Sequence, residues 1–193
     1  VALNCVANGK ILKNGIFKNI WIQPAAGDAG GAIGAALGIW HIEKEKNRNI
    51  DSSKDKMLGS YLGPEYSEEE IVKSLKELGA VFDVFDETQI VEKTSTALKD
   101  GKAIGWFQGR MEFGPRALGS RSIIADARST TMQKTLNLKV KYRESFRPFA
   151  PSIISEDLHE WFELKQKSPY MMLVSNVKKE KCREMTEKEK MLF

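Results

Sequence analysis

The chain has 193 residues, of which 41% are hydrophobic and 29% charged, and its formal net charge is +4 at pH 7. This composition is typical of one globular domain, or of a domain and part of another, and it excludes fibrous, disordered and membranous proteins. No apolar run approaches the ~20 residues that span a bilayer, and no secretion signal is recognisable. We therefore expect a cytoplasmic protein without membrane contact, in which Cys5 and Cys182 are reduced thiols.

The first 50 residues predict two helices rich in small side chains. The first helix ends at the turn Asn14-Gly15, and a short strand follows at 20–22. The second helix starts at Asp28, a residue type suited to the N-cap, and continues to about Glu45. Its many Gly and Ala residues indicate close approach by another backbone or by a ligand.

Polar residues, Gly and Pro at 51–66 predict a linker between domains, and 67–193 then form a second domain. Ser67 and Glu70 form a predicted capping box for a helix that ends at Gly79. Further helices are expected at 87–99 and 131–139, strands at 81–85, 103–107 and 122–126, and extended segments at 149–154 and 170–174. This mixture of elements predicts an α/β or α+β fold.

Positive charge is concentrated between Arg110 and Arg147, where nine Lys or Arg face three acids and the net charge is +6. Within it, the stretch GRMEFGPRALGSRS interleaves three glycines with three arginines: Gly109, Gly114 and Gly119 with Arg110, Arg116 and Arg121. Glycines let backbone N–H groups approach an anion, and arginine forks bind phosphate or carboxylate oxygens. The stretch therefore fits a phosphate or nucleotide site, and the alternative is a surface loop with exposed ion pairs.

A second basic cluster lies in KVKYRESFRPFAPS, which carries Lys139, Lys141, Arg143 and Arg147 and ends at Ser152. On an extended segment the first three of these side chains point to one face, because side chains alternate with period two. Three cations on one face repel each other, so this cluster also indicates an anionic ligand.

The loop that leads into Asp28 is rich in glycine, and a helix N-terminus of this kind suits a phosphate. Two interpretations of Asp28 stay open: an N-cap only, or a hard oxygen ligand for a divalent metal that accompanies the phosphates. His41 and His159 lack metal-type neighbours and are interpreted as structural.

Five segments together resemble the carbamoyltransferase family that includes nodulation-factor and antibiotic O-carbamoyltransferases: VALNCVANGKIL, IWIQPAAGDAGGAIGAAL, YLGPEYS, GWFQGRMEFGPRALGSRSIIADAR and KYRESFRPFAPSI. The resemblance implies the end of an actin-like ATPase-type domain at 1–50 and a domain similar to threonylcarbamoyl-adenylate synthases at 67–193. It also implies that the second domain forms carbamoyl-adenylate from ATP and carbamoyl phosphate, and that the first transfers the carbamoyl group to a hydroxyl of a small-molecule acceptor.

The resemblance assigns roles to twelve residues. Arg116, Lys141 and Arg143 would act at the reacting phosphates, and Asp28 would bind a divalent metal, with iron(II) or Mg²⁺ as the implied ion. The implied contacts to ATP or carbamoyl phosphate are Asn4, Gly30, Gly31, Arg110, Gly114, Arg121, Arg147 and Ser152.

The chain starts inside the glycine-rich element that precedes VALN in the family and stops before the family's final motifs, so we expect a fragment without the complete reaction. A different class of function is kept as the alternative: a module that binds double-stranded RNA, or a nucleotide, without catalysis. Aromatic residues among the basic ones, such as Trp106 and Tyr142, could stack on bases, although core packing is the commoner role of such residues. Nucleic acid is the less favoured ligand, and a homodimer is left open.

Overall fold

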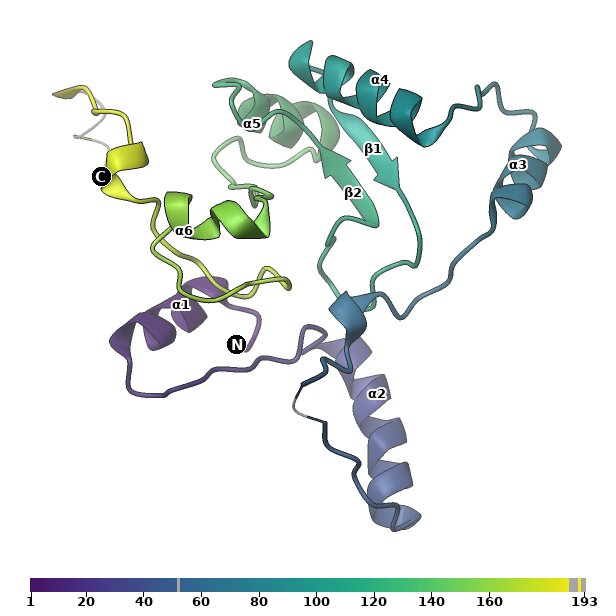
Figure 1. Ribbon diagram of the computed structural model, residues 1–193, viewed down its shortest axis with the longest axis vertical. Helices are drawn as coiled ribbons and strands as arrows, with labels where there is room; N and C mark the ends of the chain where they lie inside the picture. Colours follow the sequence, from purple (N-terminus) through teal and green to yellow (C-terminus); the bar gives the residue numbers. More distant parts are fainter. Residues whose placement is uncertain (52, 188–190, 192–193) are drawn as a thin grey trace. The chain divides into compact units, whose positions relative to one another are not determined.

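The computed structural model describes residues 1–51, 53–187 and 191. Short helices dominate it, with one small two-stranded sheet (Figure 1). The chain forms two compact units, one of Val1–Ile22 with Ser152–Phe193 and the other of Gln23–Pro151. Of the helices in the described ranges, none combines the length and the apolar character needed to cross a membrane.

In the first unit, helix α1 (Cys5–Asn14) packs closely on a segment from the other end of the chain. Asn8 is buried, and its side-chain Nδ2 donates to the carbonyl oxygen of Met172 at 3.1 Å. A Cβ placed on Gly9 would lie 2.4 Å from the carbonyl oxygen of Val174. The missing side chain of Gly9 therefore allows a close backbone contact at this position of α1.

The C-terminal segment of this unit contains short helical turns. They are a 3₁₀ turn at Ser155–Asp157, helix α6 (Leu158–Trp161) and a second 3₁₀ turn at Lys179–Lys181. An antiparallel bridge joins Phe162 to Val177.

In the second unit, helix α2 (Asp28–Gly38) continues as a π-helical turn at Ile39–Glu43, so the predicted helix is confirmed. Its N-cap is Gly27, which makes no side-chain capping bond, so the N-cap reading of Asp28 is wrong. Asp28 instead has helical backbone as the first residue of the helix, where a carboxylate still interacts favourably with the helix dipole.

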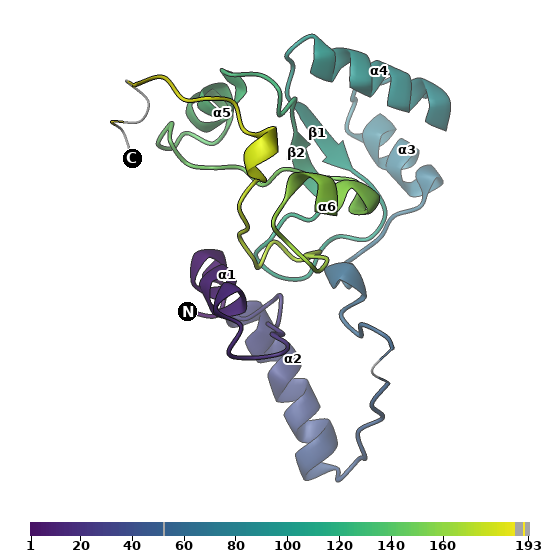
Figure 2. The same ribbon diagram turned by 60° about the vertical axis from the view of Figure 1, so that its left-hand side comes forward.

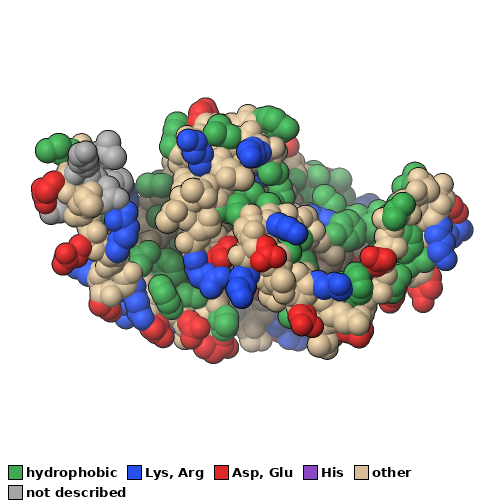
Figure 3. All heavy atoms as spheres, turned by 90° about the horizontal axis from the view of Figure 1, so that it is seen from above, with side chains coloured by type: hydrophobic (Ala, Val, Ile, Leu, Met, Phe, Trp, Pro, Cys, Tyr) green, Lys and Arg blue, Asp and Glu red, His purple; other side chains and the backbone are tan. Residues whose placement is uncertain are grey.

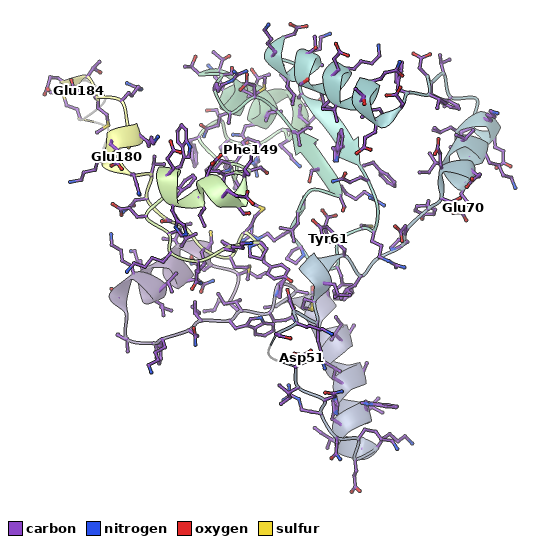
Figure 4. All side chains as sticks on the ribbon, viewed as in Figure 1. Asp51, Tyr61, Glu70, Phe149, Glu180 and Glu184 are labelled. Atoms are coloured by element: carbon purple, nitrogen blue, oxygen red, sulfur yellow. The ribbon has the colours of Figure 1, made fainter. Side chains whose placement is uncertain are left out.

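The remaining helices begin where the sequence predicts. Helix α3 (Glu68–Glu77) starts with the Ser67–Glu70 capping box, whose Glu70 is labelled in Figure 4. Helix α4 (Glu87–Lys99) has a second capping box, formed by Asp86 and Gln89, which was not predicted from the sequence. Helix α5 (Met132–Thr135) continues as a π-helical turn at Leu136–Val140, and a 3₁₀ turn lies at Leu58–Ser60.

The sheet pairs β1 (Ile104–Phe107) antiparallel to β2 (Arg121–Ile124), with Phe107 opposite Arg121. Both strands are confirmed, and α4 contacts β1, beside which it runs in Figures 1 and 2. The predicted strands at 20–22 and 81–85 are wrong, and the extended segments at 149–154 and 170–174 join no ladder within the described residues. A strand requires a partner, and Val81 is fully exposed.

Candidate anion-binding site

The arginine-rich stretch forms the loop that joins β1 to β2, and residues 60–64 make hydrogen bonds to this loop. Met111 exchanges backbone hydrogen bonds with this segment, donating to Pro64 and accepting from Gly63, both at 2.9 Å. The hydroxyl of Tyr61, labelled in Figure 4, donates to the carbonyl oxygen of Leu118 at 2.8 Å. Part of the segment predicted as a linker therefore contributes to the loop's conformation.

Glu112 lies at the centre of this loop and is buried, with 7% of its surface exposed. Its Oε1 accepts hydrogen bonds from three backbone N–H groups, those of Leu118 at 2.7 Å, Ser120 at 2.8 Å and Arg121 at 3.3 Å. Burial raises the pKa of Glu112, but the backbone hydrogen bonds outweigh burial and hold the pKa below its ordinary value of 4.5. Glu112 is therefore a carboxylate at neutral pH.

Four consecutive backbone N–H groups at the end of this loop already have acceptors within the protein. Three of the four consecutive groups at 118–121 bind Glu112, and the fourth, that of Gly119, donates to Ser122 Oγ at 3.0 Å. The N–H groups at 118–121 are therefore occupied within the protein, whereas the ligand contact predicted for Gly114 stays a prediction. Gly114, at φ 122°, meets the buried Ala25, since a Cβ there would lie 3.2 Å from the Ala25 Cβ.

Arg121 is fixed by its own backbone neighbours. Its Nη1 donates to the carbonyl oxygens of Gln108 and Ser120, each at 2.9 Å, and its Nη2 donates to that of Gly109 at 3.1 Å. The guanidinium carbon lies 3.3 Å from the centroid of the Phe107 ring, the residue opposite it in the sheet. A guanidinium has five N–H donors, so Nε–H and one Nη2–H have no partner among the described residues.

An open hollow of about 390 Å³ lies over the sheet at this position, and Arg121 and Lys141 both line it. The other lining residues are Gly105, Trp106, Phe107, Ala117, Ser122 and Ile123. Within residues 1–51, 53–187 and 191, no carboxylate is within 4.0 Å of either cation. The residues around the hollow thus include two cations and the Phe107 ring beside Arg121, a combination that fits a phosphorylated ligand with a planar ring.

Two of the other predicted arginines form ion pairs within the protein. Arg110 Nε is 3.4 Å from Glu65 Oε2, and its Nη1 donates to the Gly63 carbonyl oxygen at 3.0 Å. Arg147 Nε donates to Glu144 at 2.7 Å, and this pair keeps the pKa of Glu144 below its usual value. Both pairs are solvent-exposed, as the surface-loop alternative anticipates.

Arg143 and its neighbours are organised by Asn137, a fully buried residue. Arg143 Nε donates to Asn137 Oδ1 at 2.6 Å, and its guanidinium carbon lies 4.9 Å from the ring of Phe149, which is labelled in Figure 4. Asn137 Nδ2 donates to the carbonyl oxygens of Ser145 and Arg147. The second basic cluster therefore lies in a loop whose residues are hydrogen-bonded to the side-chain amide of Asn137.

The expectation that Lys139, Lys141 and Arg143 share one face of an extended segment is wrong. Lys139 belongs to the π-helical turn, which ends at Val140, and Tyr142 has a positive φ of 49°. Alternation with period two does not apply to such a backbone. Of these three cations, Lys141 alone lines the hollow.

Of the two glycines of α2 predicted to contact a nucleotide, Gly30 lies against protein and Gly31 faces open space. A Cβ on Gly30 would lie 2.2 Å from the Ala25 carbonyl oxygen, so Gly30 and Gly114 both approach Ala25. A Cβ on Gly31 would meet nothing within 4 Å. The two glycine-rich stretches of the sequence are thereby brought together at one buried alanine.

Asn4 and Ser152 belong to the other compact unit, and the Asn4 side chain caps α1 by accepting from Ala7 N at 3.0 Å. Arg116 is half-buried in the arginine-rich loop. The ligand contacts predicted for these residues, and for those above, stay predictions.

The residues present do not by themselves fit a divalent metal at Asp28. Its carboxylate is exposed, and in the described part of the chain no three His, Cys, Asp or Glu side chains gather into a set that could hold an ion. His41 Nδ1 is instead 2.6 Å from the Lys46 carbonyl oxygen.

Two polar residues that organise the site were not identified from the sequence. In the sequence, Glu112 is one of three acids in a basic region, and Asn137 is one polar residue of the helix predicted at 131–139. A signal for Glu112 exists: it is a lone carboxylate between the apolar Met111 and Phe113 in a loop otherwise rich in Arg and Gly. An acid in such surroundings has several N–H donors within reach.

Comparison with known proteins bears directly on this arrangement. The family model "Carbamoyltransferase C-terminus" matches residues 95–189, which include both basic loops, and "Carbamoyltransferase N-terminus" matches residues 1–37. The chain belongs to the carbamoyltransferase family.

Several relatives match nearly the whole of this chain. An uncharacterised protein of Synechocystis is 56% identical over 195 residues, which is 100% of this chain and 32% of the relative. Nodulation protein NolNO of Sinorhizobium fredii is 42% identical over 94% of the chain and 26% of the relative. The 3'-hydroxymethylcephem-O-carbamoyltransferase of Streptomyces clavuligerus is 31% identical over 92% of the chain and 31% of the relative. The chain thus spans 26–32% of the length of these relatives.

Proposed function

We propose that the hollow over β1 and β2 binds the phosphates of ATP or carbamoyl phosphate, as part of an O-carbamoyltransferase. In this proposal the C-terminal family region forms carbamoyl-adenylate, and a longer protein transfers the carbamoyl group to a hydroxyl of a small-molecule acceptor. The observation that carries it is the convergence of Arg121 and Lys141 on one hollow inside the matched region. The O-carbamoyltransferase named among the relatives supports the reaction class.

The chemistry of adenylate formation explains why two fixed cations are useful. A carbamoyl donor and the triphosphate of ATP are both anionic, so they repel each other at reacting distance. Arg121 is held rigidly by three carbonyl oxygens, and a preorganised cation of this kind offsets the repulsion without reorganising during the reaction. Phe107, which pairs with Arg121 in the sheet, provides apolar ring surface beside that cation.

The alternative, double-stranded RNA, is less well supported. On the face shown in Figure 3, Lys and Arg side chains are interspersed with Asp and Glu side chains rather than forming a continuous basic surface. RNA binding relies mainly on many phosphate contacts and falls steeply with salt. A small hollow with two cations suits a mononucleotide better.

The test is a pair of matched substitutions, Lys141→Ala and Lys139→Ala, which remove the same charge from positions two residues apart. Lys141 lines the hollow and Lys139 does not. By calorimetry on the chain, we expect Lys141→Ala to weaken binding of ATP or carbamoyl phosphate by roughly tenfold, the usual cost of one charge-assisted contact, and Lys139→Ala to change it less than about twofold.

Equal losses in the two variants would assign the effect to net charge and remove the hollow from the proposal. Steeply salt-dependent binding of a short RNA duplex, without ATP binding, would favour the alternative function.

A further inference from the structure

We infer that Glu112 is a positioning residue for the anion-binding hollow, acting through Arg121 without touching a ligand. This inference rests on the proposed function of the hollow. Glu112 is buried and does not line the hollow, so its influence must pass through the backbone that it binds.

The path from Glu112 to the Arg121 guanidinium runs through Ser120. Glu112 Oε1 accepts from the N–H groups of both Ser120 and Arg121. The Ser120 carbonyl oxygen then accepts from the Gln108 N–H at 3.0 Å and from Arg121 Nη1 at 2.9 Å. The backbone and the side-chain tip of Arg121 are thus tied to the same peptide group, which Glu112 holds.

The strand pair alone does not fix this geometry. The last residue pair of the ladder is Phe107 with Arg121, so everything from 108 to 120 lies outside it. Gly109, Gly114 and Gly119 all have positive φ, which glycine adopts without strain. Glycine also allows many other backbone conformations, so these residues do not fix the shape of the loop. A buried charged acceptor of three N–H bonds selects one of those alternatives.

The sign of the effect distinguishes positioning from simple electrostatics. Glu112 carries a negative charge within a loop whose cations are proposed to bind anions. If only its charge mattered, removing the carboxylate would strengthen anion binding. If it positions Arg121, removing it weakens anion binding despite the gain in positive charge.

The experiment compares Glu112→Gln with Glu65→Gln by calorimetry with ATP. Both substitutions remove one carboxylate that contacts the arginine-rich loop, but Glu65 is exposed and pairs with Arg110. We expect Glu112→Gln to weaken ATP binding by roughly tenfold, equivalent to the loss of one charge-assisted contact, and Glu65→Gln to leave it within about twofold of the unsubstituted chain. Unchanged or tighter binding by Glu112→Gln would overturn the inference.

A second variant guards against a failure of Glu112→Gln to fold. Glu112→Asp keeps the charge but shortens the side chain by one methylene, so its oxygen no longer reaches all three N–H groups. Positioning predicts a loss of ATP affinity in Glu112→Asp as well. Affinity equal to that of the unsubstituted chain would show that charge alone matters and overturn the inference.

A measurement without ligand separates this inference from the proposed function. In ¹⁵N spectra of the arginine side chains, we expect Glu112→Asp and Glu112→Gln to shift and broaden the Nε–H signal of Arg121, while the exposed Arg128, paired with Asp126, keeps its signal. An unchanged Arg121 signal would overturn the positioning role. Absence of ATP binding in the unsubstituted chain, with the Arg121 signal altered in both variants, would overturn the proposed function and retain the positioning role.

Discussion

At the scale of single residues, two buried polar side chains shape the basic loops. Glu112 binds three N–H groups of one loop, and Asn137 binds two carbonyl oxygens and the Arg143 guanidinium of the other. Apolar burial in the same unit is sparse: among its described residues, the buried hydrophobic side chains of the core are Ala25, Met57, Met132 and Leu136. Hydrogen bonds to these buried polar side chains, more than apolar packing, therefore determine the conformation of the loops that carry the cations.

The lowered pKa of Glu112 predicts a specific dependence of stability on pH. Because folding lowers the pKa below 4.5, the unfolded state binds the proton more tightly than the folded state does. The contribution of Glu112 is fully present above the unfolded pKa and is lost as the pH falls through the folded pKa. We expect the difference in unfolding free energy between the unsubstituted chain and Glu112→Gln to shrink from pH 7 to pH 3 in urea titrations. A difference that stays constant over this range would mean that the carboxylate does not stabilise the loop.

The hydrogen bonds of Asn137 predict a loss of stability on substitution, and Gln133 provides a control because it donates to the same carbonyl oxygen, that of Arg147. Asn137→Ala leaves the carbonyl oxygens of Ser145 and Arg147 and the Arg143 Nε–H without this partner, and we expect a loss of about 2–3 kcal/mol in unfolding free energy. Gln133 is exposed and also donates to the Arg147 carbonyl oxygen, at 3.1 Å, so Gln133→Ala should cost less than about 1 kcal/mol. Equal costs in urea unfolding would contradict the central role of Asn137.

At the scale of elements, helices were more predictable than strands. Helix starts follow from local chemistry, as at Ser67 and Glu70, where a capping box satisfies N–H groups within four residues. A strand depends on a distant partner, and residues 81–85 have the right composition but no partner. Periodicity cannot supply that information.

Helix α2 contains two adjacent glycines with opposite expected responses to alanine. Gly30→Ala places a Cβ 2.2 Å from the backbone oxygen of the buried Ala25, so the backbone must shift at a cost of about 1–3 kcal/mol. Gly31→Ala meets nothing within 4 Å and should stabilise by about 0.5–1 kcal/mol through helix propensity. Thermal unfolding of the two variants tests this, and shifts of the same sign would show that the Gly30 contact is not made.

At the scale of the whole molecule, the chain joins pieces matched by two family models and spans 26–32% of the length of the three relatives named above. Sequence motifs were sufficient to identify the family, because each motif is a short run of consecutive residues that can be read without the structure. They could not select among the cations, because Arg110, Arg143 and Arg147 look equivalent to Arg121 and Lys141 until their protein partners are seen. The pairing of a cation is a property of three-dimensional neighbours.

The most direct test of the central claim, that the hollow binds a phosphorylated ligand, is an NMR titration of the ¹⁵N-labelled chain with ATP. The chain has four tryptophans, and Trp106 is the one that lines the hollow. We predict a saturable shift of the Trp106 indole N–H signal, with the signals of Trp21, Trp40 and Trp161 unmoved, and a roughly tenfold weaker response in Lys141→Ala. A Trp106 signal that stays in place, or equal shifts at all four indoles, would contradict the claim.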